Sequence, residues 1–117
     1  MTESKKTVEK YMDGFRKNDH AQILSCLTED IEWEIPGVFH VVGKNAFEGN
    51  PGITILRMAE ENDVVVAEGK VSSQRKVGSI LSAMFCDVFI LQDVKIKKLT
   101  SYLVELKESA MKAKISE

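Results

Sequence analysis

The chain has 117 residues, of which 44% are hydrophobic and 29% charged, and its formal net charge is −2. This composition is typical of one globular domain and excludes the strongly basic surface of a nucleic-acid-binding domain. The first ten residues lack the apolar run of a secretion signal, and no segment has the roughly 20 apolar residues that a membrane-spanning helix needs.

Two cysteines, Cys26 and Cys86, are far apart and belong to no Cys-x-x-Cys or Cys/His pattern. We interpret both as reduced, buried side chains of a cytoplasmic protein, and a disulfide between them is the alternative. No motif in the chain implies a metal ion or another cofactor.

Two helices are predicted at the N-terminal end. Residues Ser4 to Lys17 carry apolar side chains at helical spacing, at Val8, Tyr11, Met12 and Phe15. Asn18 suits the end of this helix, and Asp19 is the predicted N-cap of a second helix. Gln22 is in the capping-box position of the second helix, whose predicted buried side is Ile23, Leu24 and Leu27.

From Asp30 the pattern becomes that of a strand ending at Pro36-Gly37, with Ile31, Trp33 and Ile35 alternating with Glu32 and Glu34. We expect the two glutamates to be solvated rather than to form a catalytic pair. Trp33 should point inward, where it lines a pocket or fills the core. Residues 38–50 are predicted to be irregular, with a short helix around Lys44 to Phe47. His40, in this segment, is either a surface residue or part of a pocket mouth.

Four more strands are predicted, joined by hairpin turns: Ile53 to Glu60, Asp63 to Gln74, Ser79 to Gln92 and Val94 to Leu106. Such a series forms an antiparallel meander, and the lysine-rich last strand is expected to have a solvated or edge-protecting face. Residues 107–117 are a polar tail or a short helix. Because long strands in a small sheet coil strongly, we predict an α+β fold in which a curved, cone-shaped sheet covers the first helix.

Asp87 is the main functional clue in the chain. It shares a side of its strand with Phe85 and Phe89, where a carboxylate must be paired, hydrogen-bonded or protonated. Asp87 is therefore either an acid in the wall of an apolar pocket, or a buried group that hydrogen-bonds Tyr11 or a backbone N–H and fixes the helix to the sheet.

The order of elements and the segments VEKYMDGFRKNDHAQILSCLTEDIEWEIPG and FCDVFILQDVKIKKLTSYL resemble a known family. This family is the SnoaL-like polyketide cyclase and ketosteroid isomerase-like group of the nuclear transport factor 2-like superfamily, and the resemblance covers about Val8 to Leu103. It implies one SnoaL-like domain over residues 1–117, with a cystatin-like curved sheet around the N-terminal helices. It also implies a homodimer through the open face of the sheet, where we expect Ile80, Met84, Val88 and Ile90.

The resemblance also implies roles for individual residues. Tyr11 and Asp87 fall where ketosteroid isomerases have a tyrosine and a protonated aspartic acid that donate hydrogen bonds to the substrate oxyanion. The general base of these isomerases aligns with Ile35, which cannot take a proton, and Glu34 should point to the other face.

Two hypotheses follow from these observations. In the first, the protein is an acid/base enzyme of isomerase or cyclase type that acts, without a cofactor, on a small hydrophobic molecule with a carbonyl group. Asp87 and Tyr11 would then be catalytic, and the pocket would be lined by Phe15, Trp33, His40 and Phe85. In the second, the same cone serves a non-catalytic ligand-binding protein or a dimeric interaction module.

Overall fold

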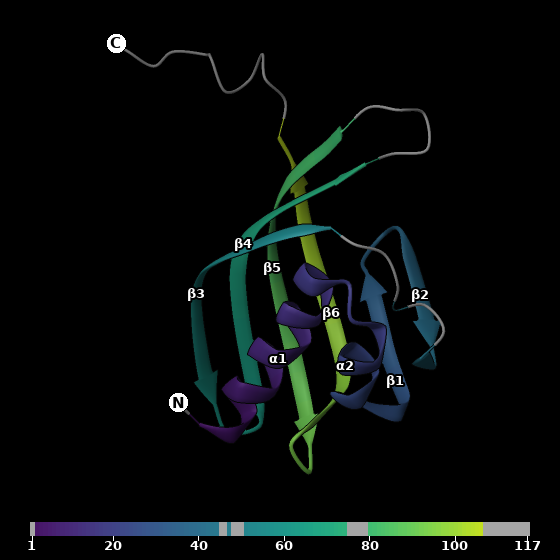
Figure 1. The fold of residues 1–117 in the computed structure, drawn as a ribbon, viewed down its shortest axis with the longest axis vertical. Helices are drawn as coiled ribbons and strands as arrows, with labels where there is room; N and C mark the ends of the chain where they lie inside the picture. The colour runs from purple at the N-terminus through teal and green to yellow at the C-terminus, as the bar shows by residue number, and fades with distance from the viewer. Residues whose placement is uncertain (1, 45–46, 48–50, 75–79, 107–117) are drawn as a thin grey trace.

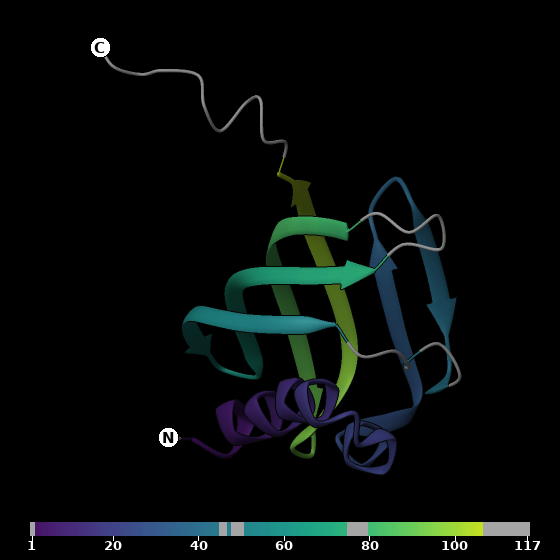
Figure 2. The same cartoon turned by 45° about the horizontal axis from the view of Figure 1, so that its top comes forward.

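Six strands form one curved sheet that wraps around a helix in this computed structural model, which describes residues 2–44, 47, 51–74 and 80–106 (Figures 1 and 2). The helices are α1 (Glu3–Lys17) and α2 (His20–Ser25). The strands are β1 (Leu27–Ile35), β2 (Phe39–Val42), β3 (Gly52–Glu61), β4 (Val64–Gln74), β5 (Ile80–Gln92) and β6 (Lys95–Glu105). Their order in the sheet is β2-β1-β6-β5-β4-β3. The predicted α+β class with a curved sheet around the N-terminal helix is confirmed.

The structure confirms the predicted caps Asn18 and Asp19. The Thr2 side chain accepts a hydrogen bond from the Lys5 N–H, and Asn18 closes α1 in the left-handed conformation, with φ of 57°. Asp19 caps α2 by accepting from the Gln22 N–H at 3.0 Å. The reciprocal half of the capping box is absent, because the Gln22 side chain donates instead to the Lys10 carbonyl.

The apolar stripe of α1 faces the sheet and forms the centre of the core. Its four predicted side chains are all buried, namely Val8, Tyr11, Met12 and Phe15. Leu27 is buried too, but it is the first residue of β1 rather than part of α2, so its predicted place was wrong. α2 ends at Ser25, before Leu27, and Cys26 is its C-cap.

The predicted meander is confirmed, because β3, β4, β5 and β6 pair antiparallel in that order. Of the two alternatives for the lysine-rich face of β6, edge protection is wrong, because β6 lies between β5 and β1. β1 pairs with β6 in parallel, with Trp33 beside Leu99. The predicted turn at 76–78 and the tail at 107–117 lie outside the described residues.

The segment after β1 is more regular than the sequence predicted. β2 returns antiparallel to β1, with Trp33 beside Val41 and Ile35 beside Phe39. Of the short helix expected near Lys44, the structure describes only the ends: the Phe47 N–H donates to the Lys44 carbonyl, and Phe47 is fully buried. Residues 45–46 and 48–50 lie outside the described part of the chain.

Both cysteines are free thiols, which contradicts the disulfide alternative. Among the described residues, no helix has the length and apolar character needed to cross a bilayer.

Candidate functional site

A cavity of about 250 Å³ lies between α1 and the concave face of the sheet. Ten of its lining residues are apolar: Met12, Phe15, Trp33, Ile35, Pro51, Ile53, Val71, Phe85, Leu99 and Leu103. The other three carry a hydroxyl or a carboxyl group, namely Tyr11, Asp87 and Ser101. The site is therefore an apolar pocket with a few polar groups on its wall, which is the usual form of a small-molecule site.

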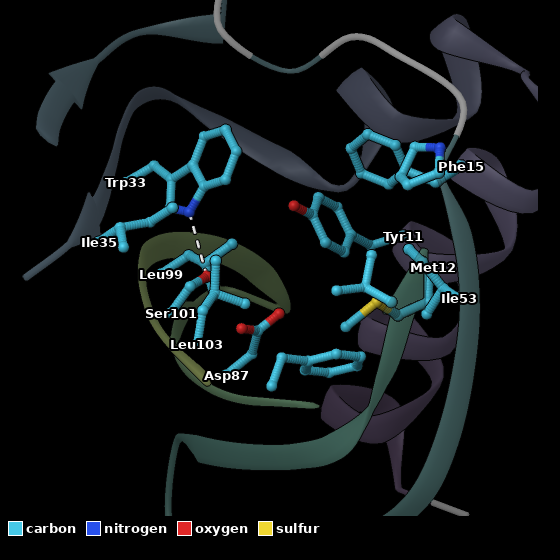
Figure 3. A pocket seen from close by; sticks show the side chains of 13 residues that line it. Tyr11, Met12, Phe15, Trp33, Ile35, Ile53, Asp87, Leu99, Ser101 and Leu103 are labelled. Atoms are coloured by element: carbon cyan, nitrogen blue, oxygen red, sulfur yellow. Dashed lines mark hydrogen bonds between the residues drawn. The ribbon is translucent and has the colours of Figure 1, made fainter. Parts of the chain in front are cut away.

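Asp87 projects into this cavity from the middle of β5 (Figure 3). Its side chain is 9% exposed, and its Oδ1 atom is buried without a hydrogen-bond partner among the described residues. Burial raises the pKa of Asp87 to about 7, and the neighbouring Ser101 hydroxyl partly opposes this rise. No charged side chain in the described part of the chain compensates for the burial, so a large fraction of Asp87 is protonated at neutral pH.

Tyr11 projects toward the same space from the opposite side, on α1 (Figure 3). Its ring packs edge-on against Phe15 and Phe89, with centroids 5.2 and 5.6 Å away. Burial, and then the nearby Asp87, raise the pKa of Tyr11 well above its usual value. The phenol therefore stays protonated, and its O–H makes no hydrogen bond to another described residue. Tyr11 and Asp87 are thus two donors at one apolar cavity.

Trp33 and Ser101 form a hydrogen bond on the cavity wall. The indole Nε1–H of Trp33 donates to the Ser101 Oγ at 3.1 Å (Figure 3). The Trp33 ring also stacks on Phe47, with centroids 5.0 Å apart, so Phe47 supports the cavity from behind.

The structure brings five of the six candidate residues to this cavity: Asp87, Tyr11, Phe15, Trp33 and Phe85. It does not bring His40 there. The side-chain alternation of a strand places His40 on the opposite face from Phe39 and Val41. Its Nε2 atom lies 3.2 Å from Oε1 of Glu32 on the outside of the sheet.

Ile35 lines the cavity at the position where the resemblance would require a general base. Glu32 and Glu34 alternate with the inward-facing residues of β1 and do not line the cavity. Among the described residues there is no group of three or more side chains suited to hold a metal ion. Asp87 is therefore the one carboxyl group on the described cavity wall.

Sequence analysis did not identify Ser101. The signal for it was a single polar residue between Leu99 and Leu103 on the inward face of the last strand. The place of Ser101 in the site becomes clear only from the pairing of β5 with β6, which puts Ser101 directly opposite Asp87.

A family model described as a SnoaL-like domain matches residues 8–99. No curated protein matches the chain.

Several solved structures share the fold. An LEH-like epoxide hydrolase from Mycobacterium tuberculosis superposes with a TM-score of 0.78 and 18% identity, over 87% of this chain and 83% of that chain. A ketosteroid isomerase-like protein from Kribbella flavida gives a TM-score of 0.75 and 14% identity, over 91% and 81% of the two chains. An NTF2-like protein from Burkholderia pseudomallei gives a TM-score of 0.77 and 16% identity, over 95% of each chain. At these identities the similarity shows a common fold.

Proposed function

The chain belongs to the SnoaL-like domain family, and we propose that it binds a small, largely apolar molecule through a carbonyl or similar oxygen, to which Asp87 donates a hydrogen bond and a proton. One observation carries this proposal. Asp87 is a buried acid with an unpartnered oxygen, and it lines an apolar cavity without a compensating charge among the described residues. Perturbed acids of this kind are concentrated at functional sites.

The chemistry supported by these groups is acid catalysis of isomerase or cyclase type. When a carbonyl compound enolises, its oxygen gains negative charge, and two donors aimed at that oxygen stabilise the transition state. Asp87 would supply the proton that the oxygen gains, and Tyr11 the second hydrogen bond. The proton lost from the α-carbon would pass to water, which also reprotonates Asp87. A pKa near the working pH suits an acid that must release and regain a proton.

The fold neighbours are consistent with this class of ligand. The names of two of them, an epoxide hydrolase and a ketosteroid isomerase-like protein, refer to small molecules with a reactive oxygen.

A second candidate function is ligand binding without turnover. The observation that favours it is Ile35, an aliphatic side chain on the cavity wall where an isomerase would need its base. The two functions differ in whether the bound carbonyl compound exchanges its α-protons.

The proposal is tested with matched pairs of a ketone and its parent hydrocarbon, such as 1-indanone and indane. Binding is followed by the fluorescence of Trp33, which is the single tryptophan of the chain and lines the cavity. We expect the ketone to bind about five- to tenfold more tightly than the hydrocarbon, as one hydrogen bond to a buried donor predicts. Asp87→Leu should abolish this preference, and Asp87→Asn, which keeps an N–H donor, should retain part of it. If no ketone of several such pairs is preferred, the proposal is wrong.

Turnover is measured separately, as loss of the α-proton signals of 1-indanone in D₂O by NMR. The enzyme hypothesis predicts exchange that is faster with the protein and at least tenfold slower with Asp87→Asn. Glu34→Gln, which removes a carboxylate outside the cavity, is the matched control and should leave the rate unchanged. A preferred ketone without accelerated exchange would favour the ligand-binding function.

A further inference from the structure

The hydrogen bond between Trp33 and Ser101 joins two strands that meet beside Asp87. β1 runs parallel to β6 with Trp33 next to Leu99, and the indole reaches two residues further along β6 to Ser101. Ser101 is 5% exposed and lies directly opposite Asp87 in the pairing of β5 with β6. Opposite residues of an antiparallel pair have Cβ atoms about 5 Å apart, within hydrogen-bonding reach for short side chains.

The direction of donation along these groups follows from their chemistry. An indole N–H can only donate, whereas a serine hydroxyl has one proton to donate and two lone pairs that accept. Because Trp33 donates to the Ser101 oxygen, the Ser101 proton must point elsewhere. The Asp87 carboxyl lies directly opposite Ser101 in the pairing of β5 with β6 and on the same cavity wall, so it is an acceptor within reach of that proton.

This direction decides what happens to the proton of Asp87. A neutral carboxyl group has one acceptor oxygen and one O–H donor. If Ser101 donates to the carboxyl group, it uses the acceptor oxygen, and the acid proton remains available. If Ser101 were free to turn, it could accept that proton and compete with a ligand for it.

We propose that Trp33 and Ser101 are positioning residues for Asp87: the indole N–H orients the Ser101 hydroxyl toward the carboxyl group, which leaves the acid proton of Asp87 to a ligand that accepts a hydrogen bond. The part of this inference that concerns the ligand rests on the proposed function. The orientation of Ser101 does not.

Among the described residues, few other titratable groups face Asp87 from the elements around it. Tyr11 comes from α1, and Cys26, at the end of α2, lies close enough to affect Tyr11. The charged residues of β1, β4 and β6 nearest in register to this site, namely Glu32, Glu34, Glu68 and Lys98, alternate with the inward-facing residues and do not line the cavity. Asp87 is therefore the group on the described cavity wall whose titration is expected to reach Trp33 through Ser101, whereas His40 lies with Glu32 on the outer face of β1 and β2.

The orientation is tested without any ligand, in the unaltered protein. Trp33 gives the only indole N–H signal in a ¹⁵N–¹H NMR spectrum, and the Asp87 carboxyl carbon is followed by ¹³C NMR. We expect the indole signal to shift with pH at the same midpoint as the Asp87 carbon, because the two groups are joined through Ser101. Different midpoints, or an indole signal that does not titrate, would overturn the inference.

Ser101→Ala separates a hydrogen-bonded relay from an effect through space. This variant should remove the pH dependence of the indole signal and raise the midpoint of Asp87 by about half to one pH unit, the equivalent of one hydrogen bond. Ser82→Ala makes the same change on an exposed position of β5 and should alter neither signal. If the indole signal still titrates in Ser101→Ala, Trp33 senses Asp87 directly and the relay does not exist.

The consequence for ligands is tested with Trp33→Phe, which keeps an aromatic ring but removes the donor. Because this variant lacks the fluorescent indole, its binding and that of the unaltered protein are compared by isothermal titration calorimetry. We expect 1-indanone to bind about three- to tenfold more weakly while indane is unaffected. Adding Ser101→Ala to Trp33→Phe should cause no further loss, because both changes interrupt the same relay. If Trp33→Phe weakened the binding of both compounds equally, Trp33 would only shape the cavity, and the inference would be wrong. Absence of any ketone preference in the unaltered protein would instead refute the proposed function, and the NMR titration would still decide the orientation of Ser101.

Discussion

Asp87 lowers the stability of the folded protein at neutral pH, because burial favours its neutral form. Its pKa is about 7 in the folded chain, whereas an aspartate in an unfolded chain has a pKa near 3.9. Between these two values the folded state binds more protons than the unfolded state, so the contribution of Asp87 to stability falls as pH rises from about 4 to 7. Below and above this window its contribution is constant.

Asp87→Asn should therefore stabilise the protein most at alkaline pH. The gain in unfolding free energy over the unaltered chain should increase by about 2 to 3 kcal/mol between pH 5 and pH 8. Urea unfolding at the two pH values measures this difference. Glu34→Gln is the control and should show no such increase. A constant difference between Asp87→Asn and the unaltered chain would mean that Asp87 is already ionised at pH 5.

At the residue level, the sequence identified Asp87 and Tyr11 but not Ser101, which lies opposite Asp87. Asp87 could be found because it is a carboxylate within an apolar pattern, and Tyr11 because the family resemblance implies a role for it. The pairing of Asp87 with Ser101 depends on an irregularity between Ile90 and Leu91, which shifts the register by one residue. Counting back from the hairpin turn without this shift would place Thr100 opposite Asp87. Such a bulge has no reliable sequence signal.

Among the elements, the β5–β6 hairpin holds an unfavourable backbone conformation at its turn. Asp93 and Val94 both have positive φ, of 52° and 64°. A β-branched residue is costly in this region, where glycine or asparagine is normally found. The Thr7 hydroxyl donates to the Val94 carbonyl at 2.8 Å and holds the turn against α1.

Val94→Gly should relieve this strain. We expect an increase in unfolding free energy of about 1 kcal/mol, since the left-handed conformation costs a residue with a side chain roughly 1 to 2 kcal/mol and glycine offsets part of the gain through its greater freedom when unfolded. The midpoint of urea unfolding measures the change. Val42→Gly, at an exposed position of β2 without positive φ, is the matched control and should be destabilising. A loss of stability in both variants would contradict this account.

Elements formed by local signals could be predicted, whereas one that depends on distant pairing could not. The helices follow from a 3.6-residue period with capping residues, and the meander follows from strands joined by short turns. The parallel pairing of β1 with β6 has no connecting turn that would reveal it. Without that pairing, edge protection remained an alternative for the lysine-rich face of β6. Without β2, the side chain of His40 could not be placed on the outer face.

At the scale of the whole molecule, the convex face of the sheet carries an apolar patch. On this face Tyr102 pairs with Cys86 and Val104 pairs with Met84. Tyr102 and Val104 are 52% and 65% exposed. Contiguous exposed apolar surface of this kind is typical of protein interfaces. We propose that a second copy of the chain covers this patch, which would give a homodimer.

The dimer is tested by sedimentation velocity of the unaltered protein and of Tyr102→Lys. A charge at the centre of the interface should raise the dissociation constant by about tenfold or more. Leu56→Lys is the control, because Leu56 is also exposed but lies on β3, at the far edge of the sheet. A monomer at all concentrations of the unaltered protein would refute the dimer.

The parallel pairing of β1 with β6 has a consequence for how the protein folds. The meander can form from neighbouring hairpins, whereas β1 must find a strand at the other end of the chain, and closing so long a loop is slow and costly in entropy. The wall of the cavity that contains Trp33 is therefore expected to be added last. Until then one edge of β6 is unpaired and open to the wrong strand, so the step that completes the binding site is also the step at which the chain is most exposed to aggregation.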